Sequence, residues 1–221
     1  MKYVILLLLL ISNCMAEQKD ESKLLTYLAL GDSYTIGESV KEEERYPVIL
    51  SKVLNKAQIP IKNPDIIART GWTTDELISA IEQKNPPDTY DLVSLLIGVN
   101  NQYRGYSQET YRKEFEILLK IAIQKAKGNK NRVFVLSIPD YGVTPFAKNS
   151  DVAKIAKEID AFNHINKAIS QQYGVKYFDI TPISREAKNN PQWIAEDHLH
   201  PSGLMYQQWV DLILEEVKAM F

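Results

Sequence analysis

The sequence LLTYLALG, at residues 24–31, is a short apolar run that ends at a glycine. Four similar runs follow it along the chain, at 65–68, 92–97, 133–138 and 175–180. Runs of this length that are apolar on both faces and bounded by Gly or Pro are typical of buried parallel strands. We therefore predict five strands at these positions, the second of them the weakest.

Amphipathic helical patterns separate these runs, with apolar residues three or four positions apart. The three clearest faces comprise Tyr111, Phe115, Leu118, Leu119 and Ala122; Val152, Ile155, Ile159, Phe162, Ile165 and Ile169; and Met205, Trp209, Leu212, Ile213 and Val217. Thr73 and Glu76 form a capping-box pattern that predicts a helix from about Thr74. Repeated strand–helix alternation implies a three-layer α/β/α sandwich with a flavodoxin-like, parallel, five-stranded sheet.

The composition is that of an ordinary globular protein and excludes several classes. Of the 221 residues, 45% are hydrophobic and 24% are charged, which excludes a disordered chain, a collagen-like fibre and a coiled coil. Lys and Arg total 26 against 28 Asp and Glu, so no broad positive charge indicates nucleic acid binding. The single cysteine excludes a disulfide framework and a Cys-based zinc cage within the chain.

The first residues resemble an export signal. Lys2 precedes nine consecutive apolar residues, 3–11, a run too short to cross a bilayer core of about 30 Å but typical of a signal peptide. We expect a signal peptide at 1–16, a tether at 17–23 and a single domain at 24–221. Residues 11–14 also resemble a bacterial lipobox, which would lipidate Cys14 and attach the protein to a membrane. The expected location is the bacterial periplasm or cell envelope.

Polar residues gather where the predicted strands end, which is where ligands bind in open α/β sheets. The loops at 31–34, 69–72 and 98–101 each combine glycine with polar residues, and Asp197 and His200 lie near the end of the chain. A carboxylate three residues from a histidine can orient the imidazole, whose other nitrogen then accepts a proton. Because a serine hydroxyl needs such a base to become a nucleophile, Ser33 is the candidate.

These motifs resemble the four blocks of the SGNH, or GDSL-type, hydrolases: Gly31-Asp32-Ser33-Tyr34, Gly71, Gly98-Val99-Asn100 and Asp197-x-x-His200. The resemblance covers essentially the whole mature chain. It implies that Ser33, His200 and Asp197 form a catalytic triad. It also implies that Gly71 and Asn100 donate to the oxyanion, with the Ser33 amide as a third donor.

Two residues depart from the family pattern. Tyr34 replaces the usual Leu, and we expect it to alter packing behind the nucleophile more than the chemistry. Asn101 replaces the usual Asp, so support for the third loop must come from elsewhere.

The expected function is that of an exported serine esterase without metal or organic cofactor, acting on a small-molecule acyl ester. Lysophospholipids, short acyl esters and acetylated carbohydrates are the candidate substrates, and the oligomeric state stays open. One alternative is a metal-dependent hydrolase. Its candidate ligands are Asp32, Asn100, Asp197, His198 and His200. The other alternative is a catalytically silent module that binds glycan or lipid.

The remaining candidates carry less weight. His198 would point away from His200 in an extended segment, and His164 lies on the polar edge of a helix. Arg104 is predicted to be a surface charge. The aromatic residues near the loops could line a substrate site or serve packing alone; these are Trp72, Tyr103 and Tyr106.

Overall fold

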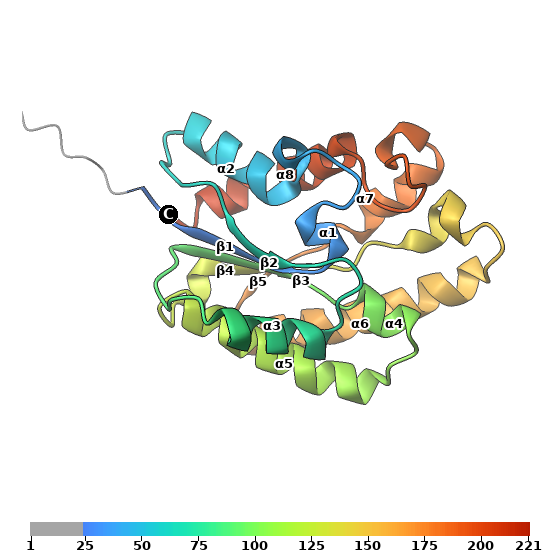
Figure 1. Ribbon diagram of the computed structural model, residues 1–221, viewed down its shortest axis with the longest axis horizontal. Helices are drawn as coiled ribbons and strands as arrows, with labels where there is room; N and C mark the ends of the chain where they lie inside the picture. Colours follow the sequence, from blue (N-terminus) through green and yellow to red (C-terminus); the bar gives the residue numbers. More distant parts are fainter. Residues whose placement is uncertain (1–23) are drawn as a thin grey trace, which may run out of the picture.

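The computed structural model describes residues 24–221 (Figure 1). The predicted signal peptide at 1–16, the lipobox cysteine Cys14 and the tether at 17–23 lie outside the described residues, and these assignments stay predictions. Among the helices of the described part of the chain, none has the length and apolarity that a membrane span requires.

Five parallel strands form one sheet in the order β2-β1-β3-β4-β5. They are β1 (Tyr27–Gly31), β2 (Asp65–Ala68), β3 (Leu92–Leu96), β4 (Val133–Leu136) and β5 (Lys176–Phe178). This order is that of flavodoxin-like sheets, in which ligands bind where the strand order reverses beside β1 and β3. The predicted fold class is confirmed.

Helices cover both faces of the sheet (Figure 1). One face carries α3 (Thr74–Lys84), α5 (Gln108–Lys125) and α6 (Val152–Tyr173). The other carries α2 (Tyr46–Lys56), α7 (Thr181–Arg185) and α8 (Gly203–Lys218). Two short helices begin directly after strands: α1 (Ser33–Ile36) follows β1 and α4 (Val99–Tyr103) follows β3. Single 3₁₀ turns complete the chain at Glu42–Glu44, Lys130–Arg132, Tyr141–Val143, Pro145–Ala147, Glu186–Lys188 and Pro191–Trp193.

The local signals behave largely as predicted. The helix α3 begins at Thr74, and the Glu76 carboxylate accepts the Thr73 amide at 2.9 Å, as in a capping box. For two residues of the predicted apolar helix faces, burial was wrongly expected: Val152 and Leu212 are each 49% exposed. Val152 is the first residue of α6, where the helix has not yet reached the core, and Leu212 lies outside the buried face of α8.

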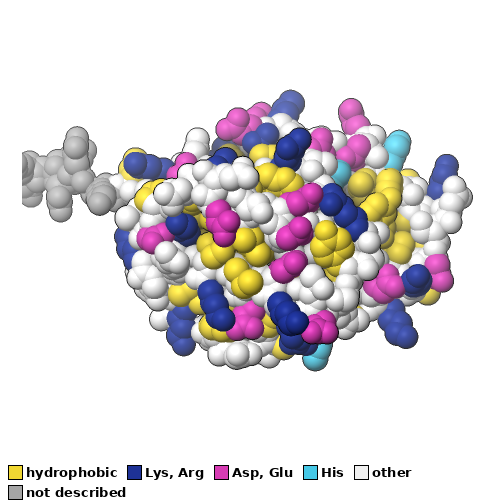
Figure 2. Space-filling model, turned by 60° about the horizontal axis from the view of Figure 1, so that its bottom comes forward, with side chains coloured by type: hydrophobic (Ala, Val, Ile, Leu, Met, Phe, Trp, Pro, Cys, Tyr) yellow, Lys and Arg dark blue, Asp and Glu magenta, His cyan; other side chains and the backbone are white. Residues whose placement is uncertain are grey.

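The surface is mixed in character. On the face turned forward in Figure 2, hydrophobic side chains lie between charged side chains of both signs. Interspersed charge of this kind is typical of a soluble protein surface and does not by itself indicate a partner.

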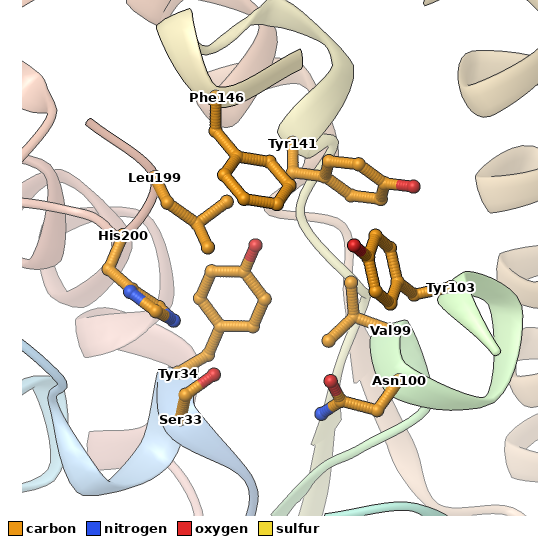
Figure 3. A pocket seen from close by; sticks show the side chains of 9 residues that line it. All are labelled: Ser33, Tyr34, Val99, Asn100, Tyr103, Tyr141, Phe146, Leu199 and His200. Atoms are coloured by element: carbon orange, nitrogen blue, oxygen red, sulfur yellow. The ribbon is translucent and has the colours of Figure 1, made fainter. Parts of the chain in front are cut away.

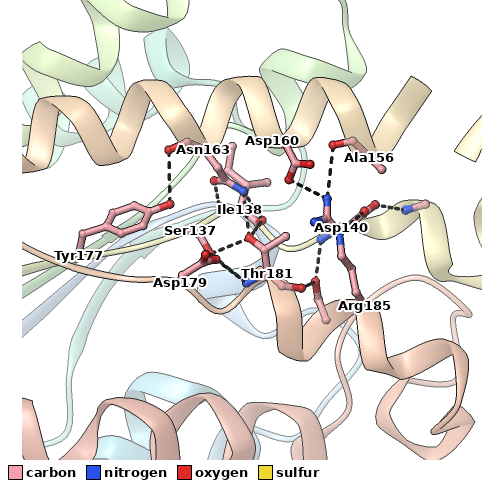
Figure 4. A network of polar contacts seen from close by, with 12 residues as sticks. Ser137, Ile138, Asp140, Ala156, Asp160, Asn163, Tyr177, Asp179, Thr181 and Arg185 are labelled. Carbon is pink, nitrogen blue, oxygen red and sulfur yellow. Dashed lines mark hydrogen bonds and ion pairs between the residues drawn. The ribbon is translucent and has the colours of Figure 1, made fainter. Parts of the chain in front are cut away.

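A buried polar network anchors the segment that follows β4 (Figure 4). The side-chain amide of Asn163 pairs with the backbone of Ile138: it accepts the Ile138 amide at 2.7 Å and donates to the Ile138 carbonyl at 2.9 Å. The Ser137 hydroxyl accepts the Thr181 amide at 3.0 Å and donates to Asp179 at 3.1 Å. Because each of these buried groups finds a partner, the segment leaves the sheet along a defined path.

An ion pair extends this network to the next loop. Arg185 donates to Asp140 at 2.9 Å and to Asp160 at 2.7 Å. The second oxygen of the buried Asp140 accepts the Gly142 amide at 2.8 Å and so caps the turn that begins at Tyr141. The loop at 141–147 is thereby held against the end of the sheet, where it forms one wall of the site.

Candidate active site

The candidate nucleophile lies at the start of a helix directly after the first strand. Ser33 is the first residue of α1 and is almost fully buried. The Asp32 carboxylate accepts the Tyr34 amide at 3.0 Å and so caps this helix. Gly31 is required before it, because a Cβ there would come within 2.1 Å of the Thr35 hydroxyl and 2.4 Å of the Leu96 carbonyl oxygen. The serine is therefore held in a tight turn at the carboxyl end of β1.

The candidate base is oriented by a carboxylate three residues before it. His200 Nδ1 lies 2.5 Å from Asp197 Oδ2, and Asp197 Oδ1 accepts the amides of Leu199 and His200, each at 2.9 Å. The pairing of Nδ1 with a carboxylate leaves Nε2 as the nitrogen that can accept a proton. In Figure 3 the Ser33 hydroxyl and one ring nitrogen of His200 point toward one another.

The environment of Asp197 favours its charged form. Partial burial opposes ionisation, but hydrogen bonds from His200, Leu199 and Ser39 hold the pKa of this carboxyl well below its ordinary value. Asp197 is therefore an anion at physiological pH and can stabilise a protonated imidazole.

Asn100 lies on the opposite side of the same opening (Figure 3). It is the second residue of α4, and one N–H of its amide donates to the Trp72 carbonyl at 2.9 Å. That bond fixes the amide plane and leaves the other N–H for a ligand. Gly98 precedes the helix with φ +131°, and a Cβ there would lie 2.7 Å from the Tyr111 ring. The close approach of Tyr111 therefore requires glycine at this turn.

Gly71 lies in the neighbouring loop, before α3, and does not line the cavity that Ser33 and Asn100 share. Its φ is +87°, and within residues 24–221 its amide donates to no protein acceptor. Arg104 donates to the Gly71 carbonyl at 2.6 Å and pairs with Glu76 at 3.3 Å. Arg104, expected to be only a surface charge, therefore holds this loop against α3 and α4.

Asn101 supplies the support that its departure from the family pattern put in question. The buried side chain accepts the Thr74 amide at 3.1 Å and donates to the Thr74 hydroxyl at 2.6 Å. An amide serves both bonds, whereas an ionised carboxylate could only accept. The third loop is therefore tied to the start of α3.

One cavity of about 120 Å³ joins these groups. It is lined by Ser33, Tyr34, Val99, Asn100, Tyr103, Tyr141, Phe146, Leu199 and His200 (Figure 3). Three of the aromatic rings pack together, with centroid distances of 6.0 Å for Tyr103 and Tyr141, 6.2 Å for Tyr103 and Phe146, and 6.3 Å for Tyr141 and Phe146. Tyr103 is 60% exposed and Phe146 48%, so both lie at the mouth of the cavity.

Tyr34 forms an inner wall of this cavity. Its ring meets the His200 ring edge to face at a centroid distance of 5.6 Å and lies 6.4 Å from Trp209. Burial holds the pKa of Tyr34 well above its ordinary value, so the hydroxyl is neutral. This hydroxyl points into the cavity in Figure 3. The tyrosine that replaces the usual leucine thus lines this cavity, in addition to packing behind the serine.

The other sequence candidates lie elsewhere. Trp72 and Tyr106 do not line the cavity. His164 and His198 are exposed. The segment around His198 is a turn, with φ +64° at that residue, rather than the extended segment considered above.

The residues proposed for a metal centre do not form one cluster. The structure describes no group of three or more His, Cys, Asp and Glu side chains that could hold a metal ion. Asp32 is fully enclosed, and burial raises its pKa to about 7.

Sequence reasoning missed Tyr141, Phe146 and Leu199 as cavity residues. A signal for the first two was present, because the loop after the fourth strand also begins at the carboxyl edge of the sheet. Leu199 could have been found from its place beside His200.

Comparison with known proteins places this geometry in a family. A model described as the GDSL-like Lipase/Acylhydrolase family matches residues 29–208. No curated protein matches the chain.

Several solved structures share the fold. A lipolytic protein of the G-D-S-L family from Veillonella parvula DSM 2008 is 20% identical with a TM-score of 0.64, over 86% of this chain and 97% of that one. Esterase EstA from Pseudoalteromonas sp., solved in a form inhibited by monoethylphosphonate, is 17% identical with a TM-score of 0.63, over 88% and 97%. An acetyl xylan esterase, AlAXEase, is 18% identical with a TM-score of 0.64, over 87% and 100%.

The family match extends from β1 to α8 and includes every motif residue from Ser33 to His200. The chain therefore belongs to the GDSL-like lipase/acylhydrolase family and is a carboxylic ester hydrolase.

Proposed function

We propose that the protein hydrolyses short-chain acyl esters through a covalent acyl-enzyme on Ser33. The observation that carries this proposal is that Ser33, His200 and Asn100 line one cavity, in which the Ser33 hydroxyl and a ring nitrogen of His200 point toward one another (Figure 3). These are a nucleophile, a base and an oxyanion donor, which together are what acyl transfer to a hydroxyl requires.

The proposed reaction has two steps. His200 Nε2 takes the Ser33 proton as Oγ attacks the ester carbonyl carbon, and the same nitrogen returns the proton to the departing alcohol. Water then attacks the acyl-enzyme, His200 takes one of its protons, and the carboxylic acid leaves as the proton returns to Ser33 Oγ. In both steps the Asn100 side chain and the Ser33 amide stabilise the oxyanion, and Asp197 holds the imidazole. Gly71, which the resemblance also implies as a donor, lies in the neighbouring loop and does not line this cavity.

The size of the cavity supports a short acyl group. The cavity of about 120 Å³ is small beside the pockets of about 300–1,000 Å³ that hold larger ligands. The exposed rings of Tyr103 and Phe146 at its mouth offer apolar area for a larger alcohol. Acetylated carbohydrates and other short acyl esters thus fit better than lysophospholipids with long chains.

Labelling with a fluorophosphonate tests the serine mechanism. We expect intact-protein mass spectrometry to show one adduct, and peptide mapping to place it on Ser33. A protein that hydrolyses esters but forms no adduct, or forms it on another residue, would contradict the proposal.

Because apolar residues 3–11 follow Lys2, we also propose export to the cell envelope. The mass of protein from cells tests this, since cleavage after residue 16 and lipidation of Cys14 give different values.

The length of the acyl chain tests the role of Tyr34. We expect the wild type to prefer p-nitrophenyl acetate or butyrate over octanoate. Tyr34→Ala should raise kcat/KM for octanoate relative to that for acetate by about tenfold or more. The reason is that each methylene group that an apolar pocket admits favours binding of the longer acyl chain. The control is Tyr34→Phe, which keeps the ring and should keep the preference. An unchanged preference in Tyr34→Ala would show that another wall limits the chain.

A further inference from the structure

Ser39 makes a contact with the triad that the motifs do not include. It lies in the loop between α1 and the 3₁₀ turn at Glu42–Glu44, and its hydroxyl donates to Asp197 Oδ2 at 2.7 Å. The same carboxylate oxygen lies 2.5 Å from His200 Nδ1. One oxygen of Asp197 is thus shared between the imidazole and a serine from the segment that follows the nucleophile.

The backbone at Ser39 adopts a conformation that disfavours serine. Its φ is +64°, in the left-handed region where glycine is the preferred residue. Ser39 is exposed, so burial of its side chain does not compensate for this conformation. Residues held in strained backbone conformations are often found at active sites. The bond to Asp197 is the one side-chain hydrogen bond of Ser39 among the described residues.

The rest of the loop holds Ser39 in place. Gly37 ends α1 in the left-handed conformation, and its amide and that of Glu38 donate to the Ser33 carbonyl at 3.0 and 3.1 Å. The Glu38 carboxylate accepts the Thr70 hydroxyl. The loop is therefore attached to the nucleophile helix on one side and to the segment before Gly71 on the other.

We propose that Ser39 is a positioning residue that fixes the carboxylate of Asp197 for His200, an inference that rests on the proposed function. Asp197 Oδ1 is held by two backbone amides, so the Ser39 hydroxyl completes the set of donors around the second oxygen. The Asp197 side chain is 29% exposed, so water can partly replace a lost hydroxyl. Loss of Ser39 should therefore slow the reaction without abolishing it.

The test is Ser39→Gly, which removes the hydroxyl and relieves the backbone strain at once. We expect kcat to fall about tenfold with KM unchanged, because the hydrogen bond acts on the triad and not on bound substrate. We expect the thermal midpoint to stay the same or rise, because glycine suits a positive φ. A purely structural role predicts the opposite combination, in which stability falls and kcat follows it only through loss of folded protein.

Three further variants serve as controls. Gln58 is also exposed and also has a φ of +65°, at the end of α2, so Gln58→Gly should raise stability without changing kcat. Ser39→Asn keeps a hydrogen-bond donor on a residue that tolerates a positive φ, and it should recover more of the wild-type kcat than Ser39→Ala does.

Coupling to Asp197 completes the test. In an Asp197→Ala background, Ser39→Gly should cause no further loss of kcat. Wild-type kcat in Ser39→Gly, or an undiminished tenfold effect without Asp197, would overturn the inference and leave the proposed function intact. Activity that survives Ser33→Ala would instead overturn the proposed function itself.

Discussion

Ser33→Ala is expected to lower the turnover of acyl esters by about 10⁴-fold or more, the range seen when a triad nucleophile is removed. The change deletes one oxygen from a nearly buried side chain that makes no side-chain hydrogen bond within the described residues. The backbone amide of residue 33 and the Asn100 amide remain, so the variant should still bind substrate. Measurement of kcat and KM with p-nitrophenyl acetate, together with a thermal melt, separates loss of chemistry from loss of fold.

The matched control for this variant is Ser150→Ala. Ser150 is exposed and lies outside the cavity, so its replacement should leave both kcat and the melting temperature unchanged. If a folded Ser33→Ala protein retained turnover within tenfold of the wild type, Ser33 would not be the nucleophile.

Asn100→Ala is expected to reduce kcat by about 10²–10³-fold while KM changes little. An oxyanion donor acts mainly in the transition state, where negative charge builds on the carbonyl oxygen, and removal of one donor typically has an effect of this size. The variant also loses the bond to the Trp72 carbonyl, which lies within 2.9 Å of the amide nitrogen. Steady-state kinetics on a short ester measures the split between kcat and KM.

Asn190→Ala controls for the loss of a side-chain bond to the backbone. Asn190 donates to the Glu186 carbonyl at 3.0 Å and does not line the cavity. Its replacement should leave the kinetics unchanged. A large rise in KM with unchanged kcat in Asn100→Ala would assign Asn100 to ground-state binding instead of oxyanion stabilisation.

The strands could be predicted from the sequence because their apolar runs are short and sharply bounded. The weakest run, at 65–68, coincides with β2. The first run extends too far at its start: Leu24 is 46% exposed, and Leu25 makes only an isolated bridge to Ile61 before β1 begins at Tyr27. Hydropathy cannot tell a strand from the extended segment that leads into it, because both carry the same residues.

The candidate site could be predicted in part, for a physical reason. Ser33 and Asn100 directly follow the region of β1 and β3, so their place at the carboxyl edge of the sheet is implied by the alternation of strands and helices. His200 is separated from β5 by α7 and two 3₁₀ turns, so only its pairing with Asp197 and the family resemblance indicated its role. Ser39 and Phe146 lie in loops, and the positions of loop residues cannot be predicted from a hydrophobic period in the sequence. The hydrogen bond of Ser39 with Asp197 joins distant parts of the chain and depends on the left-handed conformation of Ser39. No pattern in the sequence predicts that conformation.

The separation of Ser33 and His200 along the chain has a consequence for biosynthesis. The serine enters the growing polypeptide with β1, whereas the histidine and its carboxylate partner emerge only just before α8. Chains are synthesised from the amino terminus, so a growing fragment that ends before Asp197 has the Ser33 hydroxyl without its base. Under the proposed mechanism, we expect ester hydrolysis only after the segment that carries Asp197 and His200 has packed beside Ser33.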